Sequence, residues 1–162
     1  MSELTARTEA DIFCLVRAGD GGDALARIEA GLRHYRLWRP GMASRIVPVV
    51  GDLEQDRFGL SERLFRVLSR SDAVLHNGAR VNHVEPYARL RGANVAGTRT
   101  VLRLALQGQG VPVHFISTTS VALADGRVPR APVSESARPM ASELRAGGRQ
   151  VRRAGRRSQL LP

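Results

Sequence analysis

Four polar or small segments of this sequence each follow a short apolar run. They are Arg17, Asp52-Leu53, Asn77-Gly78-Ala79 and the hydroxyl-rich Ser117-Thr118-Thr119-Ser120. Singly, each has a plain structural explanation, because an arginine after a strand is usually solvated and Asn-Gly is a common turn. Their recurrence after four successive runs instead indicates a ligand site, since open α/β sheets bind ligands at the carboxyl ends of their strands.

The runs that position these segments have the length and composition of strands, at residues 12–16, 46–50, 73–76 and 111–116. Apolar residues at helical spacing between them predict helices at about 25–38, 60–68 and 86–108, with Asp23 as an N-cap and Pro86 at a first helical position. Residues 1–10 fit the last turns of a further helix. The alternation predicts an α/β fold, a partial Rossmann-like parallel sheet with crossover helices. Continuous apolar runs predict strands that are buried on both faces.

Length and composition exclude several classes of protein. The chain has 162 residues, enough for one domain, and no run of 18 apolar residues that would predict a membrane span. The N-terminus shows no signal pattern, so the expected compartment is the cytoplasm. Cys14 is the one cysteine, which excludes an internal disulfide framework. His76 and His83 have no third ligand in view, so no metal site is expected.

The net charge of +10 is distributed unevenly along the chain. Residues 1–126 carry 16 Arg and 13 acidic residues, whereas residues 127–162 carry 9 Arg and 2 Glu. All 25 basic residues are arginine. After about Asp125 the apolar pattern stops, which predicts a domain over residues 1–125 and a disordered Arg/Gly/Ser-rich tail over residues 126–162.

Five segments carry a resemblance to a known family. They are Cys14-Leu15-Val16-Arg17, Gly51-Asp52-Leu53, His76-Asn77-Gly78-Ala79 with Val81-Asn82, Asn94-Val95-Ala96-Gly97-Thr98 and Ile116-Ser117-Thr118. Together they resemble the thioester reductase domains, extended short-chain dehydrogenases at the ends of nonribosomal peptide synthetases, polyketide synthases and carboxylic acid reductases. The resemblance covers residues 4–124. The Asn-Val-x-Gly-Thr segment and the Leu-Trp-x-Pro that ends at Pro40 favour this family over the sugar epimerases.

The resemblance implies NADPH as cofactor and a role for each matching residue. Arg17 would face the 2′-phosphate, as suits a fixed cation, and Arg27 would be either a second phosphate contact or part of a solvated helix face. Asp52 and Leu53 would flank the adenine. Asn77, Gly78 and Ala79 would pass close to the cofactor ribose, where small residues let the backbone approach.

The resemblance also implies roles beside the reacting carbonyl. Thr118 or Thr119 would donate a hydrogen bond to the thioester carbonyl and stabilise its developing negative charge. Asn94 would help to hold the active-site water or lysine, or would be only structural.

Two parts of the family pattern are not found in this sequence. The first is an opening strand with its glycine-rich turn. This strand would lie between residues 12–16 and 73–76, so we expect two strand pairs with unpaired inner edges. The second is Tyr-x-x-x-Lys, because Tyr35 and Tyr87 precede the Ser/Thr segment and the chain has no lysine. We therefore interpret the chain as an incomplete piece that lacks the proton donor and is inactive by itself.

The leading functional interpretation is a reductase that uses NADPH to release a carrier-protein-bound acyl or peptidyl thioester as an aldehyde or alcohol. The alternative is a non-catalytic module that binds a nucleotide or a protein partner. Nucleic-acid binding by the nine tail arginines is not expected, because the tail has no interleaved aromatic residues and no recognition motif.

Overall fold

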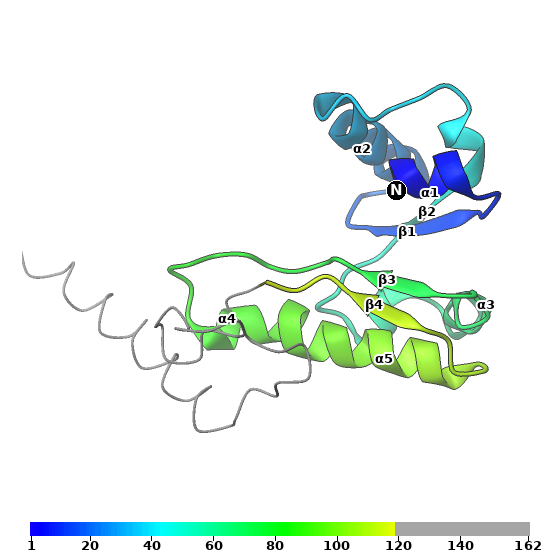
Figure 1. The fold of residues 1–162 in the computed structure, drawn as a ribbon. Coiled ribbons are helices and arrows are strands. Elements are labelled where there is room, and N and C mark those ends of the chain that lie inside the picture. The colour runs from blue at the N-terminus through cyan, green and yellow to red at the C-terminus, as the bar shows by residue number, and fades with distance from the viewer. Residues whose placement is uncertain (119–162) are drawn as a thin grey trace, which may run out of the picture. The chain divides into compact units, whose positions relative to one another are not determined.

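The computed structural model describes residues 1–118, so Thr119 and the predicted tail lie outside the described residues. Helices and strands alternate as the sequence predicts (Figure 1). In chain order they are α1 (Ser2–Arg7), β1 (Ile12–Val16), α2 (Gly21–His34), β2 (Ile46–Val50), α3 (Glu62–Leu68), β3 (Val74–His76), α4 (Tyr87–Arg91), α5 (Thr98–Gln107) and β4 (Val113–Phe115). None of the helices in residues 1–118 has the length and apolar character that crossing a membrane requires.

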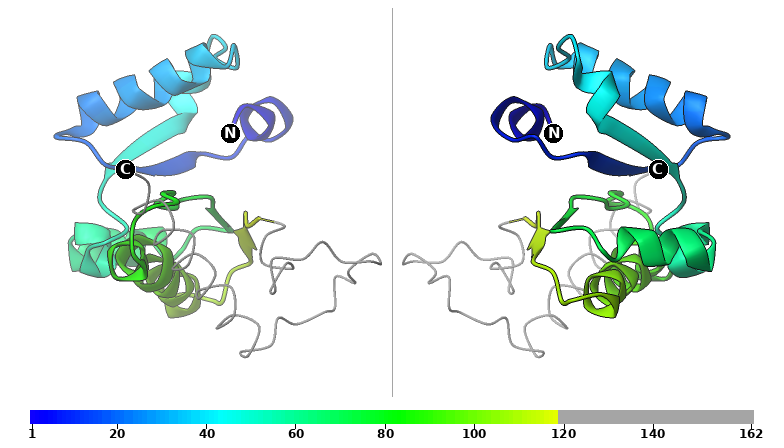
Figure 2. Two further views of the ribbon diagram at one scale, coloured as in Figure 1. Left: turned by 90° about the vertical axis from the view of Figure 1, so that its left-hand side faces the viewer. Right: turned by 90° about the vertical axis from the view of Figure 1, so that its right-hand side faces the viewer.

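The strands form two separate pairs. β1 pairs in parallel with β2, in a register that sets Ile12 beside Ile46 and Val16 beside Val50. β3 pairs with β4. Helix α2 packs along β2, and α5 packs against β3 (Figure 2). The predicted division into two strand pairs is confirmed.

The expectation that the strands are buried on both faces is wrong for the described residues. Phe13 in the middle of β1 is 46% exposed and Leu75 in β3 is 54% exposed. The exposure of Phe13 and Leu75 shows that the sheet face each one occupies is not fully covered within residues 1–118. The inner edges of β1 and β3 also have no paired strand among these residues, which leaves their backbone groups unpaired.

The best-packed part of the chain lies where α3 and α5 meet β2 and the segment after it. Phe65 of α3 is 1% exposed and contacts the ring of Phe58 at a centroid distance of 5.9 Å. The other buried members of this cluster are Val49, Leu60, Leu68, Val101 and Leu104. Leucine and valine at helical spacing on α5 supply the face that covers the cluster.

Several helix boundaries differ from the predictions. Helix α2 ends at His34, whereas its apolar spacing predicts an end at about residue 38. Asp20, not Asp23, is the N-cap of α2, and its side chain accepts a hydrogen bond of 2.9 Å from the Asp23 backbone N–H. Pro86 is the N-cap of α4 and not its first residue, so the helix begins one residue later than predicted, at Tyr87. The helix expected over 86–108 is interrupted between α4 and α5 by a π-helical segment, Gly92–Gly97.

Candidate functional site

Arg17 and Asp52 lie side by side at the carboxyl ends of β1 and β2. Parallel pairing of the two strands places the residues that follow them next to each other, and Arg17 Nη1 is 3.9 Å from Asp52 Oδ2. This distance is long for a charge-assisted hydrogen bond. The Arg17 side chain is 73% exposed, so its N–H groups can reach an added anion.

The loop after β2 is fixed by its own hydrogen bonds. The Asp52 backbone N–H donates to the Phe58 carbonyl at 3.0 Å, and Asp52 Oδ1 accepts from the Glu54 backbone N–H at 2.9 Å. Phe58 holds a left-handed backbone conformation, with φ 62°, that a bulky residue rarely adopts. Its buried ring anchors the loop to the core. Asp52 and Leu53 are therefore presented on a constrained turn.

Leu53 packs between the loop after β3 and the π-helical segment. A Cβ atom on Gly78 would lie 2.6 Å from Leu53 Cδ1, and one on Gly97 would lie 2.9 Å from the Leu53 carbonyl oxygen. Both distances are shorter than side-chain atoms tolerate. At Gly78 the close atom is the end of the flexible Leu53 side chain, which can move aside, whereas at Gly97 it is the Leu53 backbone, which cannot do so easily. The close approach therefore gives a reason for glycine at Gly97.

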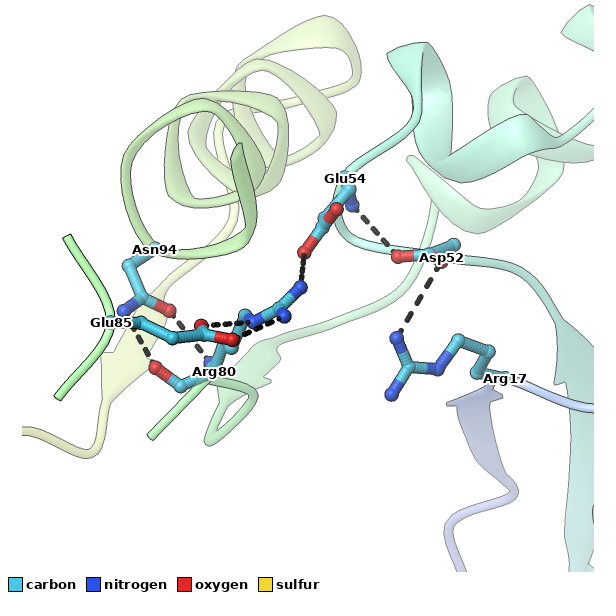
Figure 3. A network of polar contacts seen from close by, with 6 residues as sticks. All are labelled: Arg17, Asp52, Glu54, Arg80, Glu85 and Asn94. Atoms are coloured by element: carbon cyan, nitrogen blue, oxygen red, sulfur yellow. Dashed lines mark hydrogen bonds and ion pairs between the residues drawn. The ribbon is translucent and has the colours of Figure 1, made fainter. Parts of the chain in front are cut away.

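Asn94 binds the backbone that follows the loop Asn77-Gly78-Ala79. Its Oδ1 accepts from the Arg80 N–H at 2.7 Å, and its Nδ2 donates to the Arg80 carbonyl at 3.0 Å (Figure 3). Asn94 lies in the π-helical segment, a distortion that often marks functional sites. The structure thus gives Asn94 a positioning contact with the loop after β3.

Arg80 joins the loop after β2 to the loop after β3. Its Nε and Nη2 each donate to Glu85 at 2.8 Å, and its Nη1 donates to Glu54 at 3.0 Å (Figure 3). Hydrogen bonds to Glu85, and then to Glu54, raise the pKa of Arg80. The hydrogen bond from Arg80 lowers the pKa of Glu85. The network therefore favours the charged forms of Arg80 and Glu85.

The sequence prediction missed Glu54, Arg80 and Glu85. Glu54 and Arg80 have one visible signal, which is that each directly follows a predicted binding loop, but that pattern is also typical of solvated surface. Glu85 has no such signal. Glu54 and Arg80 are 26 positions apart, so helical spacing cannot suggest the pair.

His76 and Cys14 occupy strand positions inside the fold. His76 is 4% exposed, and burial lowers its pKa. Its Nε2 lies 3.0 Å from Thr98 Oγ1, which itself donates to the Asn94 carbonyl at 2.7 Å. Cys14 is half-buried, and this burial raises the pKa of its thiol. No group of three or more potential metal ligands gathers within residues 1–118.

The remaining predicted site residues lie on a helix face or in loops. Arg27 is exposed on α2 and makes no ion pair within residues 1–118. Asn77 and Ala79 are exposed in the loop between β3 and Arg80. Thr118 is exposed after β4 and belongs to a second unit, Phe115–Pro162, while Thr119 lies outside the described residues. The structure therefore assembles the strand-end part of the predicted site.

These residues fit one part of a dinucleotide. An exposed guanidinium beside a carboxylate can bind a phosphate on one side and a hydrogen-bond donor, such as an adenine amino group, on the other. Fixed loops after β2 and β3 supply backbone groups nearby. Cations that donate to a phosphate, carboxylates that accept from amino or hydroxyl groups, and small residues that let the backbone approach all suit such a ligand at parallel strand ends.

Comparison with known proteins places this geometry in a family. The model of an NAD-binding family described as Male sterility protein matches residues 1–153, beyond the predicted domain boundary at residue 125. The chain is 49% identical over 119 residues to a linear gramicidin synthase protein from Brevibacillus parabrevis, covering 73% of this chain and 2% of that protein. It is 40% identical over 159 residues to isonitrile lipopeptide synthase of Streptomyces coeruleorubidus, covering 97% of this chain and 11% of that protein. It is 38% identical over 118 residues to L-2-aminoadipate reductase of Schizosaccharomyces pombe, covering 72% of this chain and 8% of that protein.

A solved structure shares the fold. The terminal R domain from the myxalamid PKS-NRPS biosynthetic pathway matches with a TM-score of 0.80 and 41% identity, over 94% of this chain and 40% of that one. The chain thus spans about a tenth or less of these curated relatives and two fifths of this solved domain.

Proposed function

Because this chain belongs to the NAD-binding family described as Male sterility protein, we propose that it carries part of an NADPH site in a thioester reductase. The reductase would release a carrier-protein-bound acyl or peptidyl thioester as an aldehyde or alcohol. The observation that carries the proposal is Arg17 beside Asp52 at the ends of paired parallel strands. Support also comes from relatives named as peptide synthases and as an aminoadipate reductase.

The residues divide the proposed binding task among three loops. Arg17 binds the 2′-phosphate, and Arg27 on the next helix is a second candidate contact. Asp52 and Leu53 flank the adenine, while Asn77, Gly78 and Ala79 follow the ribose. Asn94 holds the last of these loops through the backbone of Arg80. When bound, NADPH would supply a hydride to the thioester carbonyl carbon, the C–S bond would break, and the carrier's sulfur would leave as a thiolate that takes up a proton.

The proposed reacting end rests on the hydroxyl groups after β4. Thr118 or Thr119 would donate a hydrogen bond to the thioester carbonyl and so stabilise its negative charge. The sequence contains no lysine, so it holds no Tyr-x-x-x-Lys proton donor. We therefore propose that the 162-residue chain by itself binds the dinucleotide without reducing a thioester, which is the behaviour of a nucleotide-binding module.

A direct binding measurement tests the cofactor assignment. Calorimetric titration of the 162-residue chain with NADPH and NADH should show tighter binding of NADPH. Arg17→Ala should weaken NADPH binding roughly tenfold or more, the scale of a hydrogen bond between charged groups, and leave NADH unchanged. Arg33→Ala, which removes an arginine paired with Glu29 on α2, is the matched control. Equal losses for both dinucleotides would contradict the assignment of Arg17.

The same chain tests the division between binding and chemistry. We expect no NADPH consumption with an acyl-pantetheine thioester above the rate without protein. Steady turnover would show that the chain holds a proton donor other than Tyr-x-x-x-Lys.

A further inference from the structure

Arg80 is the point at which three separate segments of the chain are tied together. Its guanidinium donates to Glu85, which directly precedes Pro86 and α4, and to Glu54, in the loop after β2 (Figure 3). Its backbone N–H and carbonyl both bind Asn94 of the π-helical segment. Backbone and side chain are therefore fixed independently, an arrangement that leaves Arg80 little freedom.

The contact with Glu85 is the more specific of the two. Two parallel N–H···O bonds at 2.8 Å form the fork that only a guanidinium supplies, and they leave Nη1 directed at Glu54. The Arg80 side chain is 36% exposed. At such exposure, water screens an ion pair and its contribution to folding stability is small. The geometry is thus better suited to fixing a distance than to holding the fold together.

We propose that Arg80 is a positioning residue that sets the spacing between the loop after β2 and the loop after β3, so that one dinucleotide can contact both. This inference rests on the proposed function, in which Asp52-Leu53 contacts the adenine and Asn77-Gly78-Ala79 the ribose. The Arg80–Glu54 bond directly links the segments that carry these two contacts. Arg80 also neutralises two carboxylates, Glu54 and Glu85, close to where a polyanionic ligand would lie.

Without the Arg80 side chain, the loop after β2 and the loop after β3 are held by different remaining contacts. The loop after β2 keeps its shape without the Arg80 side chain, because Asp52 binds the Phe58 carbonyl and the Glu54 N–H. For Asn77-Gly78-Ala79, the supports that remain nearby are Asn94, bound to the Arg80 backbone, and the Leu53 side chain against Gly78, neither of which is a hydrogen bond or ion pair to the three loop residues. A ligand that touches the ends of β1 and β2 alone should therefore bind normally, whereas one that spans both loops should bind less tightly.

Two ligands separate these cases in the 162-residue chain. Adenosine 2′,5′-bisphosphate reaches Arg17 and the adenine loop. NADPH carries in addition the nicotinamide-side ribose, which in this proposal is the ribose that lies against the loop after β3. Arg80→Lys keeps the charge and removes the fork, and Glu54→Gln removes one carboxylate. We expect each variant to raise the Kd of NADPH roughly three- to tenfold, while the Kd of the bisphosphate changes by less than about twofold. Arg66→Lys, which disrupts the exposed Arg66–Glu62 pair on α3, is the matched control and should change neither.

Hydrogen exchange in the free chain gives a second measurement that needs no ligand. Amides of residues 77–80 should exchange faster in Arg80→Lys than in the unaltered chain, whereas amides of α2 should not. If Arg80→Lys raised the Kd of both ligands equally, Arg80 would be a general stabilising residue and the inference would be wrong. Unchanged NADPH binding, or unchanged exchange rates at residues 77–80, would also overturn it. Binding of neither ligand to the unaltered chain would instead overturn the proposed function, and the positioning role with it.

Discussion

The region of β1, α2 and β2 differs from the region of α3, β3 and α5 in what holds it together. In the first, a regular five-residue parallel register and one covering helix account for the structure, and much of its apolar surface stays open. In the second, a buried apolar cluster, the close approach of Gly97 to the Leu53 backbone and a polar network act together. The first region displays the proposed phosphate contact, Arg17, and the second holds the loops in place.

The difference shows how stability and binding geometry are divided in this chain. Arg17 is placed by strand register alone, because the residue after β1 must lie beside the residues after β2. Asn77, Gly78 and Ala79 follow a strand of three residues, and side-chain contacts from elsewhere orient them. A change in the second region should therefore disturb more of the molecule than the same change in the first.

The largest expected effect comes from truncating one phenylalanine in each region. Phe65→Ala should lower the free energy of unfolding by about 3–5 kcal/mol, since it opens a cavity in the buried cluster. Phe13→Ala, at an exposed position of β1, should cost less than about 1.5 kcal/mol. Urea denaturation followed by circular dichroism gives both values. Similar losses would show that the two regions are equally packed.

Substitution of one helical glycine in each region should change the free energy of unfolding by a smaller amount and in opposite directions. Gly97→Ala should destabilise the chain by about 1–3 kcal/mol, because the new Cβ meets the Leu53 backbone. Gly31→Ala lies in α2, where no atom is within 4 Å of the added Cβ, and should stabilise by roughly 0.5–1 kcal/mol through helix propensity. The readout is the shift in the urea midpoint. Two shifts of the same sign would contradict the close approach at Gly97.

Much of the first region could be predicted from sequence. Apolar β-branched runs bounded by glycine or aspartate define strands, and the structure gives Ile12–Val16 and Ile46–Val50 as expected. The N-cap of α2 was placed too late because Gly21 and Gly22 are poor helix formers, yet both lie in its first turn. Burial of the strands was overestimated, since an apolar run does not show whether other elements cover both faces of the strand.

The second region contains more features that could not be predicted from the sequence. The segment Gly92–Gly97 keeps an ordinary helical pattern, so nothing in it distinguishes a π-helix from an α-helix. The link between Glu54 and Arg80 joins two loops, and charged loop residues are usually solvated. Family resemblance identified Asn94, but its contact with the Arg80 backbone exists only in the folded chain. Long-range polar contacts depend on tertiary structure, and periodicity cannot predict them.

The smallest expected effect is a pH dependence that belongs to His76 of the second region. Burial lowers the pKa of His76 below its ordinary value of 6.5 in the folded chain. The unfolded chain therefore binds more protons at this residue as the pH falls below 6.5, and the free energy of unfolding should decrease there. Well above pH 6.5 both states are neutral at His76 and its contribution is constant. Urea titrations between about pH 7.5 and 5 measure the slope.

A non-titrating variant isolates this contribution from that of the carboxylates. His76→Gln keeps an amide donor for Thr98, because Thr98 Oγ1 gives its own proton to the Asn94 carbonyl and must accept from His76 Nε2. The free energy of unfolding of His76→Gln is subtracted at each pH from that of the unaltered chain. We expect this difference to be constant well above pH 6.5 and to decrease as the pH is lowered through and below 6.5. His34→Gln, at the end of α2, is the matched substitution in the first region. A difference curve that rises as the pH falls would mean that the folded chain favours charged His76, which would contradict the expected effect of its burial.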